Sequence, residues 1–351
     1  MSSIAYIAID LHKNNSVIGH MDQNGKYLGH YWVSTSTSKL VSQVVNIDAD
    51  YKLLTIEQGN MSFWAASILN PYVDKLTVCC PRYNRWVSGG MSKDDETDTY
   101  KLCELTRLGS LKPIYHDGQM GRRRLFLHQM HEYHRLNKLL VIQKRQLTSS
   151  LAHWGYQFEV TNAMYKDPQR ICQCISEPRL GEEVAAKAGL IRYLQECKDA
   201  AFDRAGSTAG DFWEIKEFQK LPGIGPVGAH EFSAYIQTPH RFATASQLIS
   251  FCKLAVIHHS SNGRRLRTER LSKAGHGCLK ALAHRSWKEA IRSDNEVNAF
   301  YQKSLERCQG DEVKARLNTQ RKILITLWSL WRHNQSYNPD KFRGQHGVSS
   351  R

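Results

Sequence analysis

The sequence predicts an α/β N-terminal domain and a mainly α-helical C-terminal domain, joined by a long coiled-coil helix. Short apolar runs rich in β-branched residues, separated by turn residues, fill the first part of the chain. An apolar repeat in steps of four and three residues then runs from Phe126 to Trp154. Helical patterns dominate the remainder of the chain. These three observations support the predicted fold class.

The composition is that of a folded protein without a membrane span. The chain has 351 residues, of which 41% are hydrophobic and 23% charged, which is enough for a sizeable core. Its longest near-apolar run, Ile323 to Trp331, is much shorter than the roughly 20 residues that cross a bilayer. Asp10 ends the first apolar run and no basic residue precedes it, which argues against a signal peptide. We interpret the nine cysteines as reduced thiols, and we expect a cytoplasmic protein.

The predicted elements of the first domain follow a defined order. Three strands come first, and Asp22-Gln23-Asn24-Gly25 is a hairpin turn signal between the second and the third. A fourth strand, a helix, a fifth strand and a second helix follow. This is the order of the RNase H-like (RuvC-like) fold. The predicted strands cover residues 4–9, 16–21, 27–33, 51–56 and 75–80, and the predicted helices cover 61–69 and 99–108.

Four carboxylates occupy comparable places in this order. Asp10 and Glu57 each follow a predicted strand, and Asp95 and Asp98 lie three residues apart where the second helix opens. Ligands collect at the carboxyl ends of strands in open α/β sheets. Carboxylates gathered without basic partners need a cation, and their hard oxygens select Mg²⁺ or Mn²⁺. The alternative is that all four are turn and helix-cap residues.

Six segments resemble motifs of the DEDD transposases of the insertion sequence 110 family, and they occur in the family's order. The last two segments resemble those of the branch typified by insertion sequence 1111, and the Piv invertases are relatives of the family. The six segments are Ala8-Ile9-Asp10-Leu11-His12-Lys13, Thr55-Ile56-Glu57, Lys93-Asp94-Asp95-Glu96-Thr97-Asp98, Leu221-Pro222-Gly223-Ile224-Gly225-Pro226-Val227, His259-Ser260-Ser261-Asn262-Gly263-Arg264 and Leu271-Ser272-Lys273-Ala274-Gly275.

The resemblance implies a recombinase that cuts and rejoins DNA. It implies that Asp10, Glu57, Asp95 and Asp98 hold Mg²⁺ or Mn²⁺, and that Ser260 or Ser261 is the nucleophile. It also implies donor and target DNA, a structured non-coding (bridge) RNA, and a homo-oligomer that is a dimer or a synaptic tetramer. The implied domains are a RuvC-like catalytic domain (1–112), a helical linker (113–215) and a transposase domain with a helix-hairpin-helix-like turn (216–333). The Asn, Ser, Gly and Pro residues of 334–351 predict a flexible tail.

The charge distribution favours a nucleic-acid partner. The chain carries 48 basic and 33 acidic residues, a net charge of +15. Residues 251–351 hold 20 basic and 8 acidic residues, so +12 of this excess lies there. The basic residues are not arranged beside an apolar helix face, so the sequence does not predict binding to a membrane surface. The predicted nucleic-acid contacts are Lys13, Arg122, Arg123, Arg124, Gly223, Gly225, Arg264, Arg265, Arg267, Arg270 and Lys273.

The apolar repeat between residues 126 and 154 has polar residues at two core positions, Asn137 and Lys144. Polar core positions fix register and oligomer state in coiled coils, so the repeat predicts self-association. The alternative is a helix that packs within its own domain.

Two other functions fit the same residues. A RuvC-type structure-selective endonuclease would use the carboxylates with water as nucleophile and form no covalent intermediate. A catalytically inactive protein would have kept only the fold and its nucleic-acid binding.

Overall fold

The computed structural model describes residues 2–81, 86, 94–116, 118–257, 260–261, 264–265 and 270–343; at 260–261 and 264–265 it describes the backbone alone. The chain forms two compact units, Met1–Gly121 and Arg122–Arg351. Within the described residues, no helix is long and apolar enough to cross a membrane.

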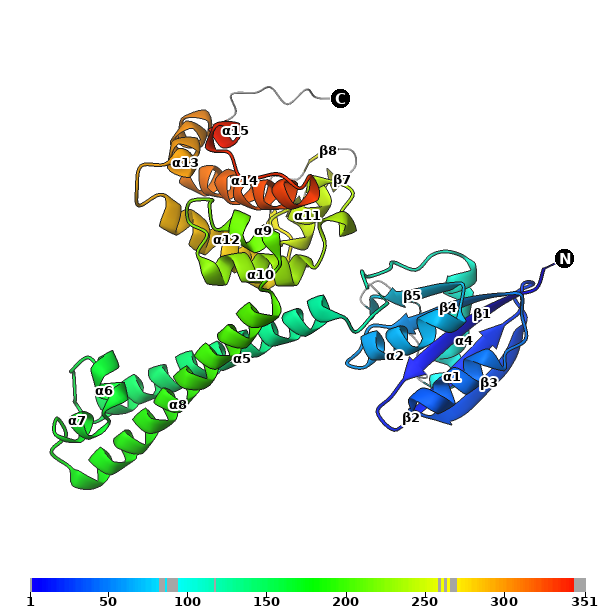
Figure 1. Ribbon diagram of the computed structural model, residues 1–351, viewed down its shortest axis with the longest axis horizontal. Helices are drawn as coiled ribbons and strands as arrows, with labels where there is room; N and C mark the ends of the chain where they lie inside the picture. Colours follow the sequence, from blue (N-terminus) through cyan, green and yellow to red (C-terminus); the bar gives the residue numbers. More distant parts are fainter. Residues whose placement is uncertain are drawn as a thin grey trace. The chain divides into compact units, whose positions relative to one another are not determined.

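The first unit is built on a mixed five-stranded sheet with the order β3-β2-β1-β4-β5 (Figure 1). Strands β1, β4 and β5 are parallel, and β2 runs antiparallel to both of its neighbours. The strands are β1 (Ile4–Leu11), β2 (Asn15–Met21), β3 (Tyr27–Ser34), β4 (Tyr51–Glu57) and β5 (Lys75–Cys79).

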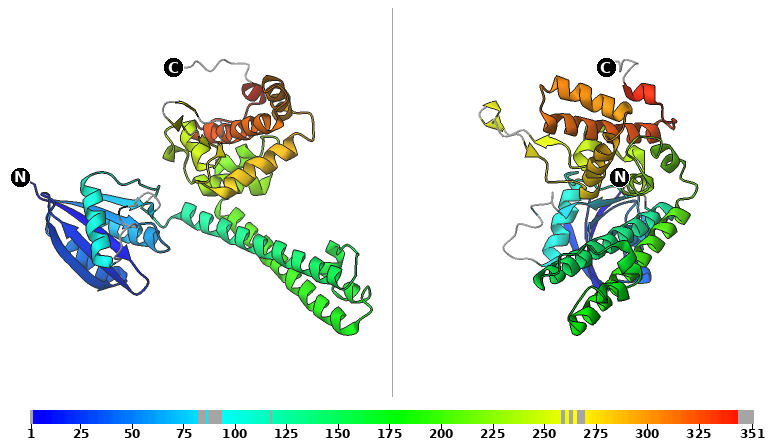
Figure 2. Two further views of the ribbon diagram at one scale, coloured as in Figure 1. Left: turned by 180° about the vertical axis from the view of Figure 1, so that it is seen from behind. Right: turned by 90° about the vertical axis from the view of Figure 1, so that its left-hand side faces the viewer.

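Helices cover both faces of this sheet. Helices α1 and α2 lie on one face in Figure 1, and the view from behind in Figure 2 shows α4 on the other. Alternation along β1 separates the two cores, since Ile7 and Ile9 pack toward α1 and α2 while Ala8 packs toward α4. The helical segments are α1 (Thr37–Val45), α2 (Ser62–Leu69), the 3₁₀ turn η1 (Asn70–Tyr72) and α4 (Asp95–Arg107).

The mixed α/β character predicted for this part of the chain is confirmed, but α1 was not predicted from the sequence. Its N-cap is Ser36, whose side chain accepts a hydrogen bond from the backbone N–H of Lys39. A capping serine ahead of an apolar residue such as Leu40 is the sequence signal that identifies such a helix.

The second unit begins with a pair of long helices, α5 (Arg122–His153) and α8 (Pro178–Thr208), which lie side by side. Two short helices, α6 (Asn162–Lys166) and α7 (Gln169–Cys172), lie at the end of the pair where the chain turns back (Figure 1).

This pairing revises the expectation that the 126–154 repeat faces a second copy of the chain. Leu140, Leu147 and Leu151 are buried in one cluster with Val184 and Ile191 of α8. The long helix was correctly predicted, but its apolar stripe from Phe126 to Leu151 is covered within the chain. A heptad-like pattern shows that a helix face is buried, and it does not show whether the covering helix belongs to the same chain.

The remainder of the second unit is a helical domain around one large core, as expected for a mainly α-helical C-terminal part. Gly223 lies in the turn before α10 with φ of +86°, and an added Cβ would lie 2.1 Å from the carbonyl oxygen of Ser286. The elements of this domain are α9 (Trp213–Phe218), α10 (Pro226–Ile236), η3 (Pro239–Arg241), α11 (Ala245–Phe251), the short strands β6 (Val256–Ile257), β7 (Ser260–Ser261), β8 (Arg264–Arg265) and β9 (Arg270–Leu271), and α12 (Gly277–Ala290), α13 (Glu296–Arg307), α14 (Glu312–Arg332) and α15 (Pro339–Arg343).

Residues 334–343 differ from the flexible tail that the sequence predicted. Within this segment, Pro339–Arg343 form α15, in which Phe342 is buried against the helical core and its ring packs on Phe300. The backbone N–H of Tyr337 donates to a carboxylate oxygen of Glu217. Both contacts join this segment to residues distant in the sequence, which composition alone does not show. Residues 344–351 lie outside the described part of the chain.

Candidate active site

Two of the predicted carboxylates lie at one edge of the sheet. Strands β1 and β4 are parallel neighbours, and Ile9 pairs with Ile56. Asp10 and Glu57 directly follow these paired residues, so the register places both at the carboxyl ends of adjacent strands. This is the position at which α/β sheets bind ligands.

The first turn of α4 supplies the other two carboxylates. Asp94 caps the helix by accepting a hydrogen bond from the N–H of Thr97 at 2.7 Å, and Asp95 and Asp98 follow in the first turn. Unpaired N–H groups and the helix dipole favour negative charge there. Gly19 lets α4 approach the sheet, because a Cβ at this position would lie 2.8 Å from the side chain of Thr99.

Asp10, His12 and Asp95 form a compact cluster. Nε2 of His12 lies 3.3 Å from Oδ2 of Asp10 and 3.5 Å from Oδ2 of Asp95. One ligand atom from each residue lies within 4.8 Å of the other two, close enough to hold a single metal ion. Two carboxylates and an imidazole are a donor set that suits Mn²⁺ and, with water ligands, Mg²⁺.

The electrostatics of the cluster show why a cation fits it. Burial raises the pKa of Asp10, the nearby carboxylates of Asp95 and Asp98 raise it further, and His12 lowers it. A cation would offset both the burial and the repulsion between these carboxylates. Carboxylates with pKa values raised by burial and by like charges are common at functional sites.

The four predicted carboxylates are not equivalent in this geometry. Glu57 and Asp98 do not belong to the three-residue cluster, although Asp98 is close enough to influence the pKa of Asp10. Glu57 is placed at the site by strand register alone.

His12 was not predicted as a site residue. The available signal was its spacing, because a residue two positions beyond Asp10 points to the same face of an extended chain. Its backbone carbonyl is fixed by the hydroxyl of Thr35, which donates to it at 2.8 Å.

The two candidate serines lie in the second unit, on a two-stranded ribbon. Strand β7 pairs antiparallel with β8, so that Ser260 lies opposite Arg265 and Ser261 lies opposite Arg264. A second short pair, β6 with β9, places Val256 opposite Leu271. The backbone register therefore gives each serine a cross-strand arginine neighbour.

Two of the predicted nucleic-acid contacts, Arg122 and Arg123, have partners within the chain. Arg123 donates to the buried Glu214 at 2.8 Å, and its guanidinium stacks over the ring of Phe212 at 4.0 Å. Arg122 donates to the carboxylate of Asp211 at 2.7 Å.

The other predicted contacts have varied surroundings. Gly223 is required by the close packing against α12, whereas a Cβ at Gly225 would meet no atom within 4 Å. Lys13, Arg270 and Lys273 are exposed, and Arg124 lies half-buried in α5. Arg267 lies outside the described residues.

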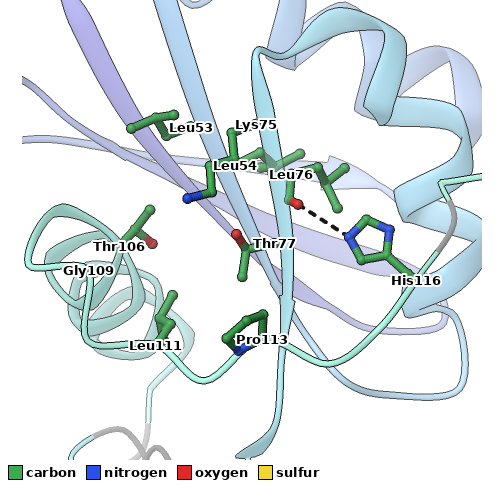
Figure 3. A pocket seen from close by; sticks show the side chains of 10 residues that line it. All are labelled: Leu53, Leu54, Lys75, Leu76, Thr77, Thr106, Gly109, Leu111, Pro113 and His116. Carbon is green, nitrogen blue, oxygen red and sulfur yellow. Dashed lines mark hydrogen bonds between the residues drawn. The ribbon is translucent and has the colours of Figure 1, made fainter. Parts of the chain in front are cut away.

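A pocket of about 320 Å³ in the first unit is separate from the carboxylate cluster (Figure 3). It is lined by β4, β5, the end of α4 and the segment that follows α4, including Thr77, Thr106 and Leu111. Nε2 of His116 lies 3.2 Å from the backbone carbonyl of Leu76 in its wall. None of the four predicted carboxylates lines this pocket.

Comparison with known proteins identifies one matching family. Residues 215–302 match the family described as Transposase IS116/IS110/IS902 family. The matched segment contains the Gly223 turn and the ribbon that carries both serines. No curated protein matches the chain. The match supports a transposase function, that is, the recombination of DNA that belongs to an insertion sequence. It also supports DNA as a partner of the protein.

Proposed function

We propose that this protein is an insertion-sequence transposase that cuts and rejoins DNA with metal-binding carboxylates and a serine nucleophile. The observation that carries the proposal is the match of residues 215–302 to a transposase family. The carboxylate cluster of the first unit adds the chemistry that such an enzyme needs.

The first unit is proposed to be an RNase H-like catalytic domain of the DEDD type. The sheet order β3-β2-β1-β4-β5 and a helix that brings two acidic residues to the end of β1 support this proposal. Asp10 and Asp95, with Glu57 and Asp98, would hold Mg²⁺ or Mn²⁺. The ions would supply charge stabilisation at the scissile phosphate and at its leaving oxygen.

In the proposed reaction, a serine of the β7–β8 ribbon attacks the scissile phosphorus. The serine Oγ–P bond forms as the serine hydroxyl gives its proton to solvent. The bond from phosphorus to the leaving sugar oxygen breaks, and that oxygen takes up a proton from solvent. That oxygen leaves as a hydroxyl, and the hydroxyl of another DNA end later displaces the serine. Arg264 and Arg265, opposite the serines in register, are the candidates to hold the phosphate oxygens.

The partners are proposed to include a structured non-coding (bridge) RNA as guide and further copies of this chain. The net charge of +12 over residues 251–351 supports a polyanionic partner. The carboxylates and the serines belong to different units, and we propose that a dimer or tetramer brings them together in one site.

A single assay tests the serine and the carboxylates. The protein is incubated with DNA carrying the element ends, the RNA transcribed from the flanking sequence, and Mg²⁺, and a protein–DNA adduct is sought on a denaturing gel. We expect the adduct with wild type, and its loss in Asp10→Asn and in one of Ser260→Ala and Ser261→Ala. Asp48→Asn and Ser149→Ala change exposed residues of the same types and should retain the adduct.

The outcomes separate the rival functions. DNA cleavage without an adduct in any variant would favour the water-using endonuclease. An adduct that persists in the Ser260→Ala, Ser261→Ala double variant would rule out both serines. Binding without cleavage would favour the inactive nucleic-acid-binding protein.

A further inference from the structure

The edge strand β3 exposes a tryptophan ring on the same face of the sheet as the carboxylate cluster. Trp32 is 61% exposed although tryptophan is usually well buried. A single exposed aromatic residue does not identify a binding site, so a role for Trp32 has to be inferred from its position in the sheet.

Strand register places Trp32 in line with Asp10. Trp32 pairs with Val17 on β2, and Val17 pairs with Asp10 on β1. Side chains of directly paired residues point to the same face of a sheet, so the ring and the carboxylate share one face. Two strand spacings separate their backbones, about 10 Å, which corresponds to roughly three nucleotide steps along one DNA strand.

Contacts at His30 and at Thr35 connect the strand that carries Trp32 to α4 and to the loop that carries His12. His30, two residues earlier on the same face, has its Nδ1 3.3 Å from a carboxylate oxygen of Glu96 in the first turn of α4. At the other end, Thr35 joins β3 to the loop that carries His12, through its backbone N–H to the carbonyl of Asn14 and its hydroxyl to that of His12. The same strand end therefore presents Trp32, His12 and the adjacent loop.

The polar neighbours of Trp32 argue against a protein-binding patch. On its own face, its strand neighbours are His30 and Ser34. The exposed Tyr31 pairs with Ile18, which packs toward α1 and α2, so its ring lies on the opposite face. A lone flat ring with polar neighbours suits a base better than it suits an apolar protein surface.

We infer that Trp32 is a stacking platform for a base of the DNA strand whose phosphate is held at the Asp10 cluster. The inference rests on the proposed function, since it assumes that the cluster binds a phosphodiester. The exposed Lys13 follows His12 in the loop after β1, and we propose it as a contact for a neighbouring phosphate. Stacking tolerates any base, so Trp32 would position the strand without selecting a sequence.

The test compares two oligonucleotides of equal length and charge, an oligothymidylate and an abasic oligonucleotide without bases. Binding to the full-length protein is measured by fluorescence anisotropy with Ca²⁺ as the divalent ion, so that cleavage is not required. We expect Trp32→Ala to bind the oligothymidylate roughly five- to hundredfold more weakly than wild type. Its affinity for the abasic strand should stay unchanged. Trp32→Phe should restore most of the loss.

Trp154→Ala is the matched control, because Trp154 is 59% exposed and lies in the second unit. It should leave both affinities unchanged. The slope of affinity against salt concentration should be the same for wild type and Trp32→Ala, because stacking releases no counterions.

The inference fails if Trp32→Ala weakens binding to both strands equally, or to neither, or if wild type binds neither strand. A change of mass in Trp32→Ala by light scattering, with equal losses on both strands, would mean that Trp32 contacts another protein copy instead. The Trp32 experiment measures binding and not cleavage, so its result can be interpreted even if the adduct assay disproves the serine mechanism. Conversely, a negative result for Trp32 would leave the adduct assay unaffected.

Discussion

His276 shows how strongly burial changes the pKa of a single side chain in this protein. Its imidazole lies against the ring of Tyr235, with centroids 4.2 Å apart, and stacks on Phe251. Its pKa is lowered to about 4, mainly by burial and to a smaller extent by the nearby His131, Arg241, His134 and Lys253. The folded protein therefore keeps this histidine neutral at pH values at which an unfolded chain would protonate it.

The sign of the effect on stability follows from this shift. Between about pH 6.5 and pH 4 the unfolded chain binds a proton at His276 and the folded chain does not, so the free energy of unfolding falls as the pH falls. By pH 5 this group alone should lower it by about 2 kcal/mol relative to pH 7. His276→Phe keeps an aromatic ring and should lose this part of the pH dependence. Urea unfolding of both proteins at pH 7 and pH 5 measures the difference, and equal losses in the two proteins would contradict it.

The helix pair α5–α8 is the element in which local pattern and tertiary structure differ most. Leu147 is fully buried within the chain, whereas Leu139 of the same helix is 42% exposed. We expect Leu147→Ala to lower the free energy of unfolding by about 2–5 kcal/mol, because it leaves a cavity between the helices. Leu139→Ala should cost less than about 0.5 kcal/mol. Denaturant titration measures both values. A Leu147→Ala variant of unchanged stability but reduced mass would instead support a seam between copies.

At the scale of the whole molecule, the two units have separate hydrophobic cores. We therefore expect residues 1–121 to fold when expressed alone, with a cooperative thermal transition followed by circular dichroism. Because Asp10, His12 and Asp95 all lie in this unit, the fragment should bind Mn²⁺ in a calorimetric titration. Asp10→Asn should weaken that binding, whereas Asp48→Asn should not. A fragment that is folded but binds the ion equally well with Asp10→Asn would exclude the cluster as the metal site.

Much of the architecture could be predicted from local pattern. Alternating apolar residues and the turn at Asp22–Gly25 identified the strands, and the strand ends identified Asp10 and Glu57 as neighbours. Periodicity also identified the long helix α5. These features depend on residues a few positions apart, whose spacing sets which face each side chain occupies.

The remaining features depended on residues that are distant in the sequence. His12 joins Asp95 across more than 80 positions, and Arg123 donates to the buried Glu214. Gly223 is required by the backbone of α12, and Leu147 is covered by a helix that returns only after residue 178. In each case the partner, not the residue itself, determines the role, and which partner is present follows from how the elements pack in three dimensions.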